Sequence, residues 1–122
     1  MMRYLLVVGA GGALGSISRY LLSQFIQNKT LSQFPYGTLT VNILGCFLIG
    51  AIYAFSTRSA VNAEMRLFLA TGLCGGFTTF SAFSNETVAM LRDGQLLFAG
   101  IYIAASVFCG IAATILAVAI FK

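Results

Sequence analysis

Long stretches of the chain carry no charged side chain. Residues 30–57, 67–85 and 94–121 are uncharged and predominantly apolar, and residues 4–26 contain a single charge, Arg19. A helix needs about 20 predominantly apolar residues to cross the hydrocarbon core of a bilayer. None of these segments shows the polar outer face that a helix in a soluble bundle presents to water. We therefore expect four transmembrane helices, at about residues 4–26, 36–57, 65–91 and 95–121.

The composition favours lipid over water as the surroundings of this chain. Hydrophobic residues make up 59% of the 122 residues and charged residues 8%, whereas an ordinary soluble domain is about 25% charged. A short chain also has a large surface for its volume. The sequence therefore predicts one all-α integral membrane domain over residues 1–122, with lipid around it and no nucleic-acid partner. A signal peptide at the start is the weaker alternative, because the helical pattern continues past Gly15.

Charges outside the apolar stretches give little preference for one orientation in the membrane. The side that holds both termini has four basic residues, Arg3, Arg58, Arg66 and Lys122. The opposite side has two, Lys29 and Arg92, or three if Arg19 reaches it. The positive-inside rule needs a larger asymmetry to select one topology. A weak bias permits the same chain to insert in both directions.

Cysteine and glycine are interpreted as packing residues. Cys46, Cys74 and Cys109 are odd in number and lie within expected spans, so they fit small buried apolar residues better than a disulfide framework. A zinc site is not expected without histidine or C-x-x-C spacing. Glycine pairs at positions 11 and 15, and at 72 and 76, have the spacing that lets two helix backbones approach closely in lipid.

The third apolar segment has an unusual composition at mid-membrane depth. Gly72, Gly75 and Gly76 precede Thr78 and Thr79, and glycine and β-branched threonine both weaken a helix. Backbone that is not helical is tolerated at this depth only inside protein or beside water. We therefore expect a break in the third helix, whose freed carbonyls suit a small cation. A glycine kink that serves packing alone remains the alternative.

A polar and aromatic stripe follows the expected break. Phe77, Phe80, Ser81 and Ser84 have the spacing of one helical face, with Phe83 beside them. Hydroxyl groups can donate to an anion, and the edges of phenylalanine rings carry positive potential. The pattern fits either an anion path or ordinary helix packing.

Further polar residues lie in the other spans. Glu86 ends the stripe, where it either controls an entrance or marks the water interface. Asn42 lies at mid-membrane depth in the second span, where an amide needs a partner and is a functional candidate. It either donates to an anion or joins two helices. Tyr102 and Ser106 form a sparse polar face in the fourth span.

At this point the chain resembles a known family over its whole length. Residues 11–20 (GGALGSISRY), 37–45 (GTLTVNILG) and 75–86 (GGFTTFSAFSNE) resemble signatures of the first three helices of the Fluc (CrcB) fluoride channels. Tyr102 and Ser106 match the fourth helix. One position departs from the family pattern, since Ala82 stands where a threonine usually lies between the two phenylalanines. Either Ser81 and Ser84 suffice, or anion binding is weakened there.

The resemblance implies an antiparallel, dual-topology homodimer with two fluoride pathways. It implies that fluoride leaves the cytoplasm by passive electrodiffusion across the bacterial inner membrane, through a multi-pass protein that is not an enzyme. It assigns the ion pathway to Asn42, Phe80, Ser81, Phe83, Ser84, Tyr102 and Ser106. It further implies a structural sodium ion (Na+) at the dimer centre, held by the backbone carbonyls of Gly75 and Thr78, and a structural or vestibule role for Arg19. Glu86 stays a vestibule candidate because of its position near the end of the span.

Three other functions compete with this interpretation. A proton-coupled small multidrug transporter would need a carboxylate in the first helix, where the only charge is Arg19. A dinucleotide-binding enzyme would need an acidic residue about 20 positions after its glycine-rich turn, and residues 30–57 contain none. An accessory subunit of a larger membrane complex is compatible with the composition, but it predicts no ion flux from the purified chain.

Overall fold

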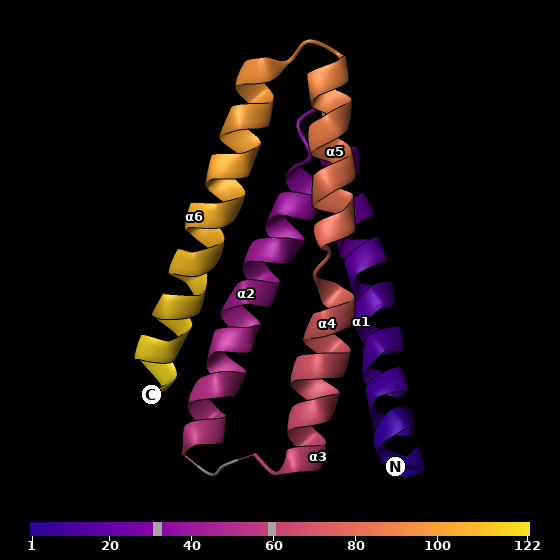
Figure 1. The fold of residues 1–122 in the computed structure, drawn as a ribbon, viewed down its shortest axis with the longest axis vertical. Coiled ribbons are helices and arrows are strands. Elements are labelled where there is room, and N and C mark those ends of the chain that lie inside the picture. The colour runs from indigo at the N-terminus through magenta and orange to yellow at the C-terminus, as the bar shows by residue number, and fades with distance from the viewer. Residues whose placement is uncertain (31–32, 59–60) are drawn as a thin grey trace.

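The computed structural model describes residues 1–30, 33–58 and 61–122, and the described part is helical in four long spans (Figure 1). The expected connectors include positions 31–32 and 59–60, which lie outside the described residues. Each span is long and apolar enough to cross a membrane. The first, second and fourth spans are α1 (Met2–Lys29), α2 (Tyr36–Thr57) and α6 (Leu96–Phe121). The termini lie at the same end of the bundle.

The third span, Ala63–Arg92, is composite. It begins with α3 (Ala63–Arg66), where Asn62 Oδ1 accepts from the Met65 N–H at 2.7 Å and so caps the helix. It continues as the π-helix η1 (Leu67–Cys74), then α4 (Gly75–Phe77) and α5 (Phe80–Arg92). Residues 78 and 79 have extended backbone between α4 and α5, and we refer to them as the 78–79 segment.

The first span is longer than the expected range 4–26. α1 continues to Lys29, whose cationic side chain in the last turn is favourable at the negative end of the helix dipole. At the other end, Arg3 forms an ion pair of 3.1 Å with Glu64 of α3. The helix therefore extends past the apolar stretch into the polar margin. The start of α2 at Tyr36, directly after Pro35, agrees with the expected range 36–57.

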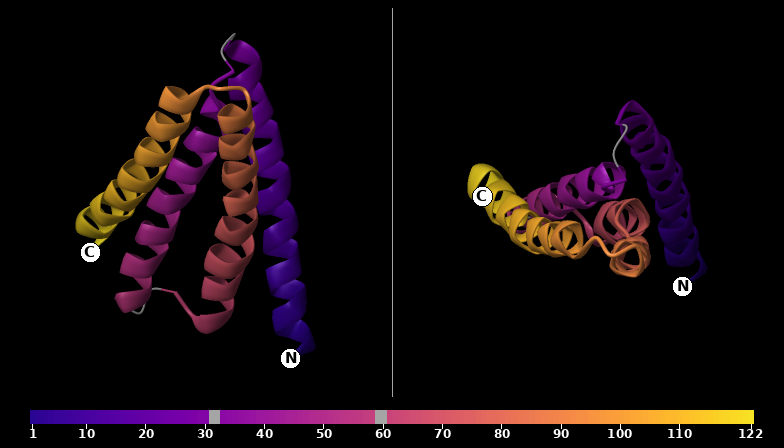
Figure 2. Two further views of the ribbon diagram at one scale, coloured as in Figure 1. Left: turned by 45° about the horizontal axis from the view of Figure 1, so that its top comes forward. Right: turned by 90° about the horizontal axis from the view of Figure 1, so that it is seen from above.

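Glycines create the crossing between α1 and the third span. A Cβ atom added at Gly11 would lie 2.5 Å from the Phe68 carbonyl oxygen, and one at Gly76 would lie 2.5 Å from the Gly12 carbonyl oxygen. A Cβ at Gly72 would lie 2.9 Å from Gly11 Cα. The two backbones are thus in direct contact, as the small-residue spacing predicted. Figure 2 shows α1 on one flank of the bundle and α6 on the other.

α2 packs most extensively along α6, and it also contacts α1 and the third span. The α2 and α6 backbones are in close contact at Gly50, where an added Cβ would lie 2.5 Å from the Thr114 carbonyl oxygen. Thr114 Oγ1 also donates to the Cys46 carbonyl at 2.8 Å. The expectation for the cysteines holds in part. Cys74 is buried and Cys46 half-buried, but Cys109 is exposed on the outer face of α6, so its burial was predicted wrongly.

Candidate functional site

The 78–79 segment owes its geometry to its two threonines. Thr78 is bound to the end of the preceding helix, because both its N–H and its Oγ1 donate to the Cys74 carbonyl, at 3.0 and 2.9 Å. Thr79 begins the next helix, because its Oγ1 accepts from the Ala82 N–H at 3.2 Å, in the usual role of a threonine N-cap. Thr79 Oγ1 also lies 3.1 Å from Ser81 Oγ.

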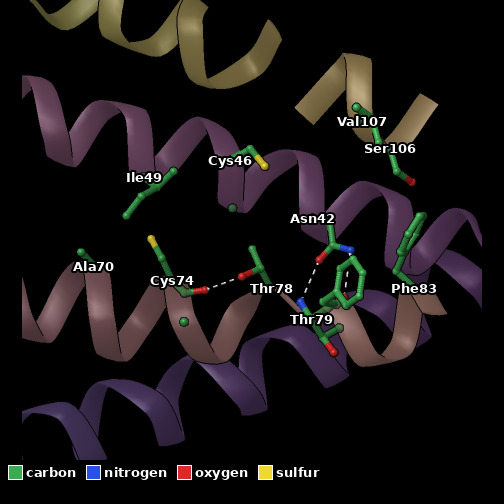
Figure 3. Close-up of a pocket in the computed structure, with 13 residues that line it drawn as sticks. Asn42, Cys46, Ile49, Ala70, Cys74, Thr78, Thr79, Phe83, Ser106 and Val107 are labelled. Carbon is green, nitrogen blue, oxygen red and sulfur yellow. Dashed lines mark hydrogen bonds between the residues drawn. The ribbon is translucent and has the colours of Figure 1, made fainter. Parts of the chain in front are cut away.

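Asn42 of α2 holds this segment with both ends of its amide. Its Oδ1 accepts from the Thr79 N–H at 3.0 Å, and its Nδ2 donates to the Thr79 carbonyl at 3.3 Å (Figure 3). The Asn42 side chain thus replaces the bond that the Thr79 N–H would have made in a continuous helix, and it adds a donor to the Thr79 carbonyl, which is the N-cap carbonyl of α5. The sequence left two roles open for Asn42, donation to an anion or a link between two helices. In this structure its amide links α2 to the third span.

Arg19 of α1 lies on the opposite side of the same region. Its Nε donates to the Gly76 carbonyl at 3.0 Å, close to the end of α4. A cation at a helix C-terminus is favourable because of the partial negative charge there. The guanidinium is therefore bound to the backbone in this structure, and it does not line the groove described below.

Two carbonyl groups lose their ordinary helical donors here. In a continuous helix the Gly75 carbonyl would accept from the Thr79 N–H, which donates instead to Asn42. The Thr78 carbonyl would accept from the Ala82 N–H, which donates instead to Thr79 Oγ1. Carbonyl oxygens released in this way are hard ligands of the kind that small cations prefer. Gly75 is exposed and Thr78 half-exposed, so the region is open to a ligand or a partner.

An open groove of about 490 Å³ runs between α2, the third span and α6. Figure 3 shows its side chains converging from these three elements. Most of the lining is apolar, with a few amide, hydroxyl and thiol groups. The residues are Asn42, Gly45, Cys46, Ile49, Ala70, Cys74, Gly75, Thr78, Thr79, Phe80, Phe83, Ser106 and Val107.

Sequence reasoning identified about half of this lining. It missed Thr79, although a threonine directly before an apolar run is an N-cap signal. It also missed Cys46, which lies one helical turn after Asn42 and therefore on the same face of α2. The expected residues Ser81 and Ser84 are both exposed and lie outside the groove lining.

The aromatic residues are divided between the groove and the core. Phe80 is 78% exposed, and its ring centroid is 5.6 Å from that of Phe83. Phe83 in turn packs against Tyr102, with 5.1 Å between centroids. The prediction that Phe77 shares their face is wrong. Phe77 is buried at the end of α4, and the extended residues after it change the direction of the side chains.

Three buried hydroxyl oxygens have no hydrogen-bond partner within the described part of the chain: Ser56 Oγ near the end of α2, Tyr102 OH and Ser106 Oγ. Tyr102 is fully buried, and its hydroxyl lies near Thr38 and Glu86 without a hydrogen bond of ordinary geometry to either. Thr38 Oγ1 donates to Glu86 Oε1 at 2.6 Å. Glu86 also lines a second cavity of about 160 Å³, together with Asp93. Hydroxyl groups of this kind are available to donate to an anion.

Comparison with known proteins places the chain in a family. The family described as "CrcB-like protein, Camphor Resistance (CrcB)" matches residues 6–118. A protein named fluoride-specific ion channel FluC from Flavobacterium psychrophilum is 46% identical over 93% of this chain and 92% of its own length. The FluC protein from Phocaeicola vulgatus is 46% identical over 96% of this chain and 97% of its own length. The FluC protein from Rhizobium meliloti is 49% identical over 87% of this chain and 86% of its own length. With its four apolar spans, the chain is a multi-pass protein of the bacterial cell membrane, and it belongs to the CrcB family.

Proposed function

We propose that this chain forms a fluoride-selective channel through which fluoride leaves the cytoplasm passively. The observation that carries the proposal is the groove beside the 78–79 segment, where Phe80 and Phe83 lie beside Ser106, whose buried hydroxyl oxygen has no hydrogen-bond partner among the described residues. It is supported by relatives that are named fluoride-specific ion channels and are similar over nearly the whole chain. In this proposal the chain conducts an ion and is not an enzyme.

The groove has the chemistry that a small anion needs. Fluoride is strongly hydrated, so a pore must replace its water with well-placed donors and still release it. Ser106 Oγ supplies a hydroxyl donor in the groove, and the edges of Phe80 and Phe83 supply weak positive potential. Tyr102 is fully buried behind Phe83 and lies outside the groove lining. No lysine or arginine is among the residues that line the groove in the described ranges, and Arg19 is bound to the Gly76 carbonyl. An anion therefore meets donors but no fixed cation that would trap it.

An antiparallel homodimer would close the open side of the groove. Phe80 is 78% exposed and Gly75 and Ser81 are also exposed, although all three lie at mid-membrane depth. A conducting path requires protein on every side of the ion, because lipid offers no donors. A second copy of the same chain, inserted in the opposite direction, fits the weak charge bias between the two ends.

The same assembly would hold a sodium ion. The carbonyls of Gly75 and Thr78 have lost their helical donors, and two antiparallel copies would bring four such oxygens together. Oxygen ligands without net charge suit a monovalent hard cation. This ion would supply a positive charge that stabilises the freed backbone at the dimer centre. Asn42 and Thr79 would then hold the carbonyls in place rather than contact the ion.

The test is fluoride efflux from liposomes that contain the purified chain. Liposomes are loaded with potassium fluoride, and valinomycin is added to release the counter-ion potassium. We expect valinomycin-dependent release of fluoride, and no release from matched liposomes loaded with potassium chloride. Absence of fluoride release from folded, monodisperse protein would refute the channel and favour an accessory role. Proton-dependent transport of cationic drugs would favour the multidrug transporter instead.

A further inference from the structure

The connection between α1 and α2 places an aromatic residue in the core. Phe34 is 6% exposed and belongs to a buried cluster with Met90, Ala99 and Tyr102. Its ring meets the ring of Tyr102 edge-on, with 5.6 Å between centroids and 83° between planes. It meets Phe98 in the same way, at 6.0 Å and 89°. Tyr102 is therefore held between a loop residue on one side and α5 on the other.

A continuous row of rings runs from this connection to the groove. It passes from Phe34 to Tyr102, then to Phe83 and finally to Phe80, with successive centroid distances of 5.6, 5.1 and 5.6 Å. The first ring comes from the connection, the second from α6 and the last two from α5. Because tightly packed rings settle in defined rotamers, displacement of the first ring changes the space available to the others.

Gln27 in the last turn of α1 fixes the backbone that carries Phe34. Its Nε2 donates to the Phe34 carbonyl at 3.1 Å, and its Oε1 accepts from the Gly37 N–H at 3.1 Å. The Gly37 N–H is one of the donors at the start of α2 that have no partner within their own helix. Gln27 therefore couples the position of Phe34 to the start of α2.

We propose that Gln27 and Phe34 are positioning residues for the ion pathway. Gln27 fixes Phe34, Phe34 fixes the ring of Tyr102, and Tyr102 in turn sets the orientation of Phe83 beside the groove. The inference rests on the proposed channel function. It gives the α1–α2 connection a defined role in conduction, although neither residue lines the groove.

The first test replaces Phe34 with leucine, which keeps most of the volume but removes the ring. Near-UV circular dichroism reports on the tyrosine rings, since the chain contains five tyrosines and no tryptophan. Tyr36 also contacts Phe34, with 4.8 Å between centroids, so the contribution of Tyr102 has to be isolated. The band that Tyr102 contributes is obtained, in the native chain and in each variant, by subtracting the spectrum of the same chain that also carries Tyr102→Phe. We expect F34L to lose this band. We also expect its fluoride flux to fall about two- to twelvefold, the change in population that loss of the Phe34–Tyr102 pair supports.

A matched control keeps the test specific. Phe47 makes a similar edge-on contact with Phe121, at 6.1 Å and 76°, between α2 and α6 and away from the row of rings. Phe47→Leu should keep both the Tyr102 band and the native flux. Equal losses of flux in F34L and F47L would show a general packing defect and overturn the inference. A native band or native flux in F34L would also overturn it.

The second test separates the bond from Gln27 to the Phe34 carbonyl from its bond to the Gly37 N–H; Gln27 Nε2 also donates to Thr30 Oγ1, at 3.4 Å. Gln27→Glu keeps an acceptor for the Gly37 N–H but has no donor for the Phe34 carbonyl. We expect Q27E to lose the Tyr102 band and flux as F34L does, while the far-UV spectrum of its helices stays native. Native flux in Q27E would refute the role of Gln27. If the native chain itself releases no fluoride, the proposed function has failed and this inference with it, an outcome distinct from failure of the variants alone.

Discussion

Replacing Asn42 with leucine tests whether its amide holds the 78–79 segment or serves only the anion. Leucine has a similar shape but makes neither the 3.0 Å bond from the Thr79 N–H nor the 3.3 Å bond to the Thr79 carbonyl. A hydrogen bond contributes about 1 kcal/mol net in soluble proteins, and interhelical bonds in membranes average about 0.6 kcal/mol. Two bonds therefore predict a loss of about 1–2 kcal/mol in the free energy of unfolding.

The assay is reversible denaturation in mixed detergent micelles, followed by circular dichroism, with fluoride efflux measured on the same preparations. Thr114→Val is the matched control, because it removes one bond between α2 and α6, from Oγ1 to the Cys46 carbonyl. We expect T114V to lose about 0.6 kcal/mol and to keep its flux. We expect N42L to lose more stability and also flux, because the backbone beside the groove shifts.

One result would refute this reasoning. If N42L loses fluoride flux while its unfolding free energy stays equal to that of the native chain, the amide acts on the anion directly. The bonds to Thr79 would then contribute nothing measurable. A loss of stability with native flux would show the opposite, that the 78–79 segment is held by Asn42 but plays no part in conduction.

Three further predictions follow from the same geometry. Gly11→Ala should lower the free energy of unfolding by about 1–3 kcal/mol, because its Cβ would overlap the backbone of the third span. Gly9→Ala is the control, because its Cβ would meet no described atom within 4 Å. Equal stabilities of the two variants in the same denaturation assay would contradict the close crossing. Phe80→Ile and Phe83→Ile should each reduce fluoride efflux while the elution volume in size-exclusion chromatography stays that of the native chain, and normal conduction by both would exclude the aromatic path. Ala82→Thr should raise fluoride efflux by adding a hydroxyl to the half-buried side of α5, and an unchanged rate would show that the existing hydroxyls suffice.

The sequence by itself determined which segments lie in lipid. That property depends on the composition of each stretch, because the transfer of a helix into the bilayer sums over its own side chains. It therefore placed α2 at about residues 36–57, and the glycine spacing indicated helices that approach closely, whereas only the structure showed that α1 and the third span meet at these glycines. Composition also indicated where helical hydrogen bonding is weakest, but not which groups replace the lost bonds.

Only the tertiary structure decided those replacements. Asn42 reaches Thr79 across 37 positions, and Arg19 reaches the Gly76 carbonyl across 57. The burial of Phe77 and the exposure of Cys109 likewise depend on the direction of neighbouring helices. The physical reason is that a hydrogen bond is short and directional, so its partner depends on how distant segments pack, whereas hydrophobicity is a local sum that the sequence contains in full.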